Sequence, residues 1–361
     1  MILIDFSSSI LILESYMNIV ASSFLMEQRK IMSLGSSLAV TLPKEWVKEN
    51  CLKKGGSVTM TVQRDNNLLL SPAEDFNLKP TKELHLLIGF NEDEESIVRK
   101  IIAGFLNGYS LIKLTSNRYF TSHQQVTIRD ITSKLYMMIL EAESSSITLQ
   151  MLLDESKASV VSSIERMHVI NYSMCKDILG SFHDMDKELL QVIYSLEKEV
   201  DRLMFLLLRM IRMAAVNPFL AKQISLDPID CLDYQTLVHR IERIGDHLAQ
   251  FSKSMISILD LEISVPTEVY STIQEAAEIA FTTYDMAVRA YMAKDVSKAD
   301  EIIDNQQKIV DLYKKITPIP YFGKHNNLTA LSQIITMREC VKKISHYSAD
   351  IAELTIGRAY K

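Results

Sequence analysis

The chain has 361 residues, 47% of which are hydrophobic, and a formal net charge of −6. It is therefore long enough for two or three domains that each bury a core. Ten Gly, eight Pro and a single Trp favour long helices over a sandwich or barrel that needs many turns. The four Cys are far apart and include no Cys-x-x-Cys pair, which argues against a zinc ribbon or a disulfide framework.

Residues 1–25 form an apolar N-terminal extension. They contain no Lys or Arg and include Asp5 and Glu14, so they lack the run of about 20 apolar residues that spans a membrane. A carboxylate inside a bilayer is also costly. We predict no stable membrane insertion. The extension is interpreted as disordered, or as a segment upstream of a true start at Met26.

Residues 26–72 have the pattern of a small β-rich domain. Leu38, Val40 and Leu42 alternate with smaller or polar residues and predict a strand that ends before Pro43. A short helix and two further strands follow, which gives the order β-β-α-β-β. A unit of this size has too many unpaired strand edges to be stable alone, so we expect it to form a homodimer.

This small domain is also basic. Between Met26 and Arg64 the sequence has seven Lys or Arg and three acidic residues, a net charge of +4. The whole chain has a charge of −6, so the remainder carries −10. A basic arm on an acidic body indicates an anionic partner for the arm.

The same domain resembles the AbrB/SpoVT family of swapped-hairpin DNA-binding domains. The resemblance rests on Arg29-Lys30, Gly35-Ser36-Ser37, the segment from Val40 to Trp46, and the turn Lys54-Gly55-Gly56. In that family two chains interleave, and basic residues near the first strand and loop approach DNA. The resemblance implies DNA as a partner, and the implied DNA-binding residues are Arg29, Lys30, Ser36, Ser37 and Lys44. The alternative is a domain that only dimerises.

Residues 80–155 predict a small α/β domain. Strand-like runs at 84–88, 111–114 and 147–150 alternate with helical patterns at 94–106 and 122–135. The segment has neither a phosphate-binding loop nor a catalytic cluster. We interpret it as a spacer or interaction domain.

Residues 156–361 predict only helices, so the fold class is mainly α. Each of the two segments, 156–260 and 262–361, has the pattern of a three-helix bundle. In the first segment, Asp227 and Pro228 form a typical helix start. In the second, Ser297 with Asp300 resembles a capping box.

Two acidic pairs stand out in the first segment. Glu197 and Asp201 are one helical turn apart, as are Glu242 and Asp246. The two side chains of each pair therefore project from the same face of their helix. Neighbouring carboxylates repel each other, and a bound cation relieves this repulsion. Their oxygen atoms suit iron, zinc, manganese or magnesium. The alternative is that they form ordinary surface pairs with Lys or with Arg243.

The acidic pairs have counterparts in the second segment. Aligning the two segments places Glu197/Asp201 on Gln307/Asp311 and Glu242/Asp246 on His346/Asp350. A tandem duplication of a three-helix unit explains both offsets.

The region from 156 to 361 resembles the PhoU family of phosphate-uptake regulators. Those proteins are two tandem three-helix bundles with Glu/Asp-x-x-x-Asp motifs, some of which bind clusters of iron or other metals. The resemblance implies a metal ion cluster in the first repeat. In the second repeat Gln307 is a neutral, weaker ligand, so we expect weaker metal binding there. The implied metal ligands are Glu197, Asp201, Glu242, Asp246, Asp311, His346 and Asp350.

An AbrB-like arm joined to a PhoU-like body resembles archaeal phosphate-uptake regulators. This resemblance implies a cytoplasmic regulator that lowers phosphate import, through a phosphate transporter, through its signalling partners, or by binding DNA. One alternative is a scaffold that does not bind DNA. Another is a ferritin-like di-metal enzyme, because Glu165-x-x-His168 matches one of its motifs. That architecture needs two such motifs, so we expect no enzyme and interpret His168 as a surface or capping residue.

Overall fold

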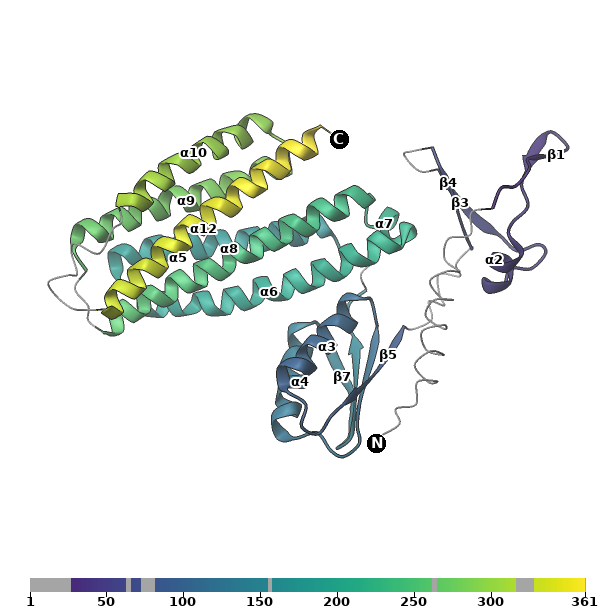
Figure 1. Cartoon of the computed structure of the whole chain (residues 1–361), viewed down its shortest axis with the longest axis horizontal. Helices are drawn as coiled ribbons and strands as arrows, with labels where there is room; N and C mark the ends of the chain where they lie inside the picture. Colours follow the sequence, from purple (N-terminus) through teal and green to yellow (C-terminus); the bar gives the residue numbers. More distant parts are fainter. Residues whose placement is uncertain are drawn as a thin grey trace, which may run out of the picture. The chain divides into compact units, whose positions relative to one another are not determined.

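The computed structural model describes residues 27–62, 66–72, 82–154, 158–261, 265–315 and 328–360. Contacts between Cα atoms divide the chain into two compact units, residues 1–80 and 81–361 (Figure 1). The extension of residues 1–25 lies outside the described residues. Each unit is described by itself.

The first unit contains two antiparallel hairpins and one short helix. The first hairpin turns at Gly35, whose φ of 62° is in the left-handed region that glycine adopts readily. The order β-β-α-β-β agrees with the prediction, although the second strand ends at Ala39, before the expected Pro43. The elements are β1 (Met32–Leu34), β2 (Ser37–Ala39), α2 (Lys44–Glu49), β3 (Val58–Val62) and β4 (Leu68–Pro72).

This unit has no buried core among its described residues. Large apolar side chains face solvent on both hairpins, and Leu38 is 77% exposed. An isolated two-stranded hairpin is marginally stable, and exposed apolar strands are suited to pairing with another chain. The other exposed large apolar side chains of this unit are Ile31, Met32, Leu34, Val40, Met60, Val62 and Leu68.

The second unit begins with an α/β domain. Its sheet has the order β5-β6-β8-β7, in which β5 and β6 are parallel and the other neighbours are antiparallel. Figure 1 shows α3 and α4 together on one face of this sheet. The prediction missed β7, because its residues follow the helix without a break in the apolar pattern. The elements are β5 (Glu83–Ile88), α3 (Glu94–Leu106), β6 (Leu111–Ser116), α4 (Ser122–Lys134), β7 (Met137–Ala142) and β8 (Ser146–Met151).

The rest of this unit is helical and contains two three-helix repeats. The first repeat has α5, α6 and α8 with the short α7 inserted, and the second has α9, α10 and α12. One continuous apolar core runs through both repeats. The helices are α5 (Val160–Asp184), α6 (Lys187–Val216), α7 (Pro218–Gln223), α8 (Pro228–Asp260), α9 (Thr267–Ala293), α10 (Val296–Lys315) and α12 (Leu328–Ala359).

The helix starts agree with the prediction in one case and correct it in another. Asp227 is the N-cap of α8 and Pro228 its first residue, as predicted. The backbone N–H of Asp227 also donates to the carboxylate of Asp230 at 3.3 Å. The predicted capping box of Ser297 and Asp300 is wrong. The carboxylate of Asp295 instead accepts from the backbone N–H of Lys298 at 3.0 Å, so the helix begins two residues earlier.

The α/β domain is fixed to α6 by a buried cation. The guanidinium of Arg209 is fully buried and donates to the backbone carbonyls of Phe105 and Tyr109, the latter at 3.0 Å. These carbonyls lie at and just beyond the C-terminal end of α3, where a helix attracts positive charge. The α/β domain and the first repeat therefore share an interface that is partly core. Over the described ranges, no helix is both long enough and apolar enough to cross a membrane.

Candidate metal centre

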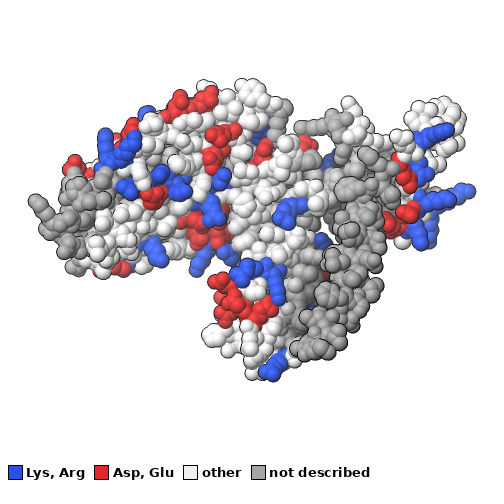
Figure 2. Space-filling model, in the orientation of Figure 1, with Lys and Arg blue, Asp and Glu red and all other residues white. Residues whose placement is uncertain are grey.

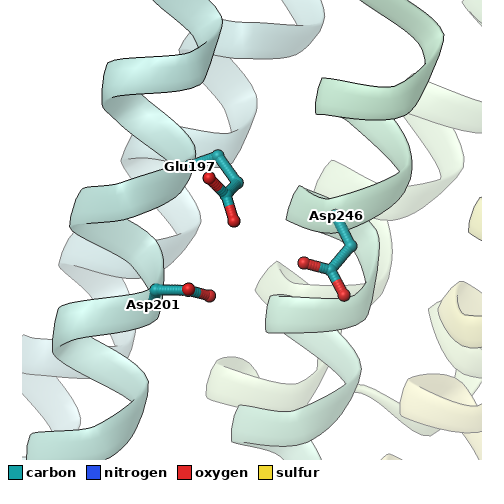
Figure 3. A group of neighbouring side chains, drawn as sticks. All are labelled: Glu197, Asp201 and Asp246. Carbon is teal, nitrogen blue, oxygen red and sulfur yellow. The ribbon is translucent and has the colours of Figure 1, made fainter. Parts of the chain in front are cut away.

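The two acidic pairs of the first repeat face each other across neighbouring helices. Oxygen atoms of Glu197 and Asp201 on α6 and of Asp246 on α8 all lie within 4.8 Å of one another. Figure 3 shows the three side chains directed toward one another between the helices. Glu242, the fourth predicted ligand, contributes no oxygen to this group, but it lies close enough for the charges of Asp246, Asp201 and Glu197 to raise its pKa. We call Glu197, Asp201, Asp246 and the neighbouring Glu242 the acid cluster.

Apolar neighbours hold these carboxylates at the edge of the core. Val200 on α6 is buried between the acids of its own helix, and Ile241 and Ile244 on α8 are fully buried. The acidic side chains project from the same helices beside these buried residues, so the carboxylates are only partly solvated. The side chain of Glu242 is 13% exposed and that of Asp246 is 35% exposed.

Burial and mutual repulsion raise the pKa of three of these carboxyl groups. Burial, with the charge of Asp246, raises the pKa of Glu242 to about 7, against the lowering effect of Arg243. Burial and the charges of Asp201 and Asp246 raise the pKa of Glu197. The pKa of Asp246 is raised by burial and then by Asp201. The site thus favours either protons or a further cation.

Two side-chain cations already lie at this acid cluster. Lys134, the last residue of α4, forms an ion pair with Asp201. Arg243 Nη1 lies 3.4 Å from Asp246 Oδ2, and Arg243 Nε lies 3.7 Å from Glu242 Oε2. With all four acids ionised, the two cations leave two negative charges uncompensated. A set of carboxylate oxygens with this excess charge fits a hard or borderline divalent metal ion.

The candidate ligands of the second repeat have different surroundings. Asp311 is exposed and accepts from Gln307 at 3.1 Å, with Lys314 Nζ at 3.4 Å. Asp350 pairs with Arg240, and His346 is exposed. Within the described part of the chain, ligand atoms of Asp311, His346 and Asp350 form no group comparable to that of the first repeat. Metal binding by these three residues stays a prediction.

His168 is not a surface or capping histidine, which corrects the sequence-based interpretation. It lies between α5 and α9, with Nε2 at 3.0 Å from Asp285 Oδ1 and Nδ1 at 3.1 Å from the hydroxyl of Tyr284. Both ring nitrogens therefore have partners in the second repeat. No sequence pattern indicates this contact, because His168 is 116 positions from Tyr284 and 117 from Asp285.

The predicted DNA-binding residues all lie on the surface of the first unit. Arg29 and Lys30 precede β1, and Arg29 forms an ion pair with Glu27. Ser36 is in the first turn and Ser37 begins β2, while Lys44 is the first residue of α2. Figure 2 shows basic side chains projecting from this unit. Their exposure leaves them available to phosphate groups.

Comparison with known proteins follows the same division of the chain. Residues 164–255 and 273–355, one stretch from each repeat, match the PhoU domain. Residues 31–77 match the family described as antidote-toxin recognition MazE, bacterial antitoxin. The comparison with curated proteins gave no match.

Two solved structures are similar to the helical part. PhoU from Pseudomonas aeruginosa is 18% identical, with a TM-score of 0.48, and the match covers 55% of this chain and 93% of that one. The phosphate transport system regulatory protein PhoU from Streptococcus pneumoniae is 15% identical, with a TM-score of 0.44, and the match covers 55% of this chain and 91% of that one. The assignment rests on the domain matches: the helical part of the chain carries two PhoU domains, the domain of a family of regulators of phosphate transport, and a MazE/AbrB-like domain precedes them.

Proposed function

We propose that this protein is a cytoplasmic, phosphate-responsive regulator of phosphate uptake that binds DNA through its first unit and metal through its first PhoU repeat. The observation that carries the proposal is the pairing of two features in one chain. A basic β unit, whose described residues include no buried one, precedes a PhoU tandem in which one repeat has an acid cluster. The first feature suits an anionic polymer, and the second suits a divalent metal ion.

The β unit supports DNA binding through its charge and its exposed apolar strands. Two copies would cover the apolar faces of both hairpins and bring two sets of basic residues together. Lys and Arg contacts to phosphates supply an affinity that falls steeply with salt. We therefore propose a homodimer with Arg29, Lys30, Ser36, Ser37 and Lys44 at the DNA surface.

The helical body supports regulation rather than catalysis. Proteins of the PhoU family are regulators, and the ferritin-like alternative needs a free His168. That histidine is engaged by Asp285 and Tyr284. We propose that metal binding at the acid cluster reports a cellular state, and that the body transmits it to a phosphate transporter or to its signalling partners.

Duplex DNA binding at low and moderate salt tests the DNA part of the proposal. We expect the full chain to bind duplex DNA at low salt and to lose affinity as salt rises. Double substitution Arg29→Ala with Lys30→Ala should abolish this binding. The matched control is Lys298→Ala with Lys308→Ala, which removes two exposed charges from α10.

The same experiment distinguishes the proposed DNA-binding regulator from the main alternative, a scaffold that dimerises without binding DNA. In that case the protein would not bind duplex DNA at any salt concentration. The Arg29/Lys30 variant would then regulate phosphate uptake as the unsubstituted chain does.

A further inference from the structure

The turn that leaves α4 is docked on α6 beside the acid cluster. Lys134 ends α4, and its ammonium pairs with Asp201 while lying 5.5 Å from the ring centroid of Phe205. Two residues later Tyr136 has a φ of 53°, which turns the chain back along the helix. The guanidinium carbon of Arg202 lies 4.7 Å from the centre of the Tyr136 ring. Both ends of the turn thus contact one stretch of α6.

This contact differs in kind from the other attachment of the α/β domain to α6. At Arg209 the guanidinium is fully buried and bonds to backbone carbonyls. The side chain of Lys134 is 37% exposed, and its partner Asp201 belongs to the acid cluster. The Arg209 contact is therefore independent of the charge state of the cluster. The Lys134 contact depends on it directly.

A metal ion in the cluster and the Lys134 ammonium would compete for the same carboxylate. An ion bound by Glu197, Asp201 and Asp246 would have to lie among oxygen atoms that are within 4.8 Å of one another. Asp201 Oδ2 already holds the Lys134 ammonium. Two positive charges this close repel strongly in a partly desolvated site. The exposed side chain of Lys134 can leave toward solvent.

We propose that Lys134 is an internal counter-ion of the acid cluster, and that a divalent metal ion displaces it and releases the α4–β7 turn from α6. This inference rests on the proposed metal site. Metal binding would thus loosen the α4–β7 turn of the α/β domain, while the Arg209 contact keeps the domain attached to α6. Because coupling is reciprocal, loss of the Lys134 contact must raise the affinity for metal.

The test compares two substitutions that each remove one lysine charge from the α/β domain of the full chain. Lys134→Met removes the proposed counter-ion. Lys100→Met removes a lysine that pairs with Glu92 at 2.6 Å within the α/β domain itself. Calorimetric titration with Mn²⁺ or Zn²⁺ should show Lys134→Met binding at least about fivefold more tightly than the unsubstituted chain, a typical lower value for allosteric coupling. Lys100→Met should bind like the unsubstituted chain.

Hydrogen exchange provides the second readout. Metal should increase exchange in residues 131–142 of the unsubstituted chain, whereas in Lys134→Met this segment should exchange fast with or without metal. Equal metal affinity for the unsubstituted chain and Lys134→Met, with no change in exchange, would overturn the inference and leave the metal site standing. Failure of both proteins to bind metal would overturn the metal site and the inference together.

Discussion

Arg240 Nε lies 2.9 Å from Asp350 Oδ2, and this ion pair joins α8 of the first repeat to α12 of the second. Asp350 occupies the position in the second repeat that corresponds to Asp246 in the first. The two carboxylates have different surroundings. Asp246 lies within 4.8 Å of two other carboxylates and has Arg243 Nη1 at 3.4 Å, whereas Asp350 pairs with Arg240 and belongs to no such acidic group among the described residues.

This difference predicts how Asp350→Asn behaves. The Asp350 side chain is 40% exposed, so loss of the pair should lower the free energy of unfolding by less than about 1 kcal/mol. Metal content should not change. Urea unfolding and elemental analysis of the purified variant check both statements, and loss of metal would show that the second repeat contributes ligands.

Glu242→Gln should stabilise the protein in chelator at high pH. Because the folded chain raises the pKa of Glu242 to about 7 from 4.5, it holds this proton more tightly than the unfolded chain does. Stability therefore falls as the pH rises from about 4.5 to about 7. The variant lacks this loss, and the gain at pH 8 should be roughly 1 to 3 kcal/mol, since the group is partly solvated.

Urea unfolding at pH 5 and pH 8 in EDTA measures the effect of Glu242→Gln. The gain should be present at pH 8 and much smaller at pH 5. Glu275→Gln, an exposed residue on α9, serves as the control and should show no such difference. A gain that is equal at both pH values would contradict the assigned cause.

Asp285→Asn should weaken the contact between the two repeats. Asp285 is 15% exposed, accepts from His168, and is bound through both oxygens by Arg289 Nε at 2.9 Å. Hydrogen bonds to a charged group contribute more than neutral ones, so we expect a loss of about 2 kcal/mol in the free energy of unfolding. Asp300→Asn, an exposed position on α10, is the control. A loss no larger than that of the control would show that the contact contributes little.

Acid should destabilise the protein partly through His168. Burial lowers the pKa of His168 in the folded chain, and the nearby charge of Asp285 only partly opposes this. Below about pH 6.5 the unfolded chain binds the proton more readily than the folded chain, so stability falls as the pH decreases. Thermal unfolding of His168→Gln between pH 5 and pH 8 should show a smaller dependence on pH. If the unfolding temperature of His168→Gln depends on pH as steeply as that of the unsubstituted chain, other groups cause the acid sensitivity.

Leu38→Asp should disrupt the proposed dimer of the first unit. This side chain is 77% exposed, and none of the described residues of the first unit is buried, so a charge there would have to be buried when two copies pair. Light scattering of the full chain should show a monomer. Val216, at the end of α6, is 83% exposed. Val216→Asp should leave the dimer intact, and a dimeric Leu38→Asp would contradict this interface.

The sequence was sufficient to predict the order of domains and the helical repeats, because both depend on local patterns. Spacing alone places Glu242 and Asp246 on one face of a helix, and Asp227 with Pro228 marks a helix start. The strand β7 was missed because Leu135 to Leu140 form an unbroken apolar run, which has no period to separate helix from strand.

The surroundings of the acid cluster could not be predicted in the same way. Lys134 is 67 residues from Asp201 in the sequence, and their contact exists only because the α/β domain docks on α6. His168 likewise meets Asp285 only through the packing of two repeats. Such contacts depend on the tertiary arrangement and leave no regular spacing in the sequence.

Metal content tests the central proposal most directly. The full chain should be purified both aerobically and anaerobically and analysed for iron, zinc, manganese and magnesium, together with Glu242→Ala/Asp246→Ala. The matched control is Asp311→Ala/Asp350→Ala, which removes two acids from the second repeat. We predict bound metal in the unsubstituted chain and in the control, and none in the Glu242/Asp246 variant. Metal that remains on the Glu242/Asp246 variant, or that is absent from the unsubstituted chain, would contradict the assignment of the site to the first repeat.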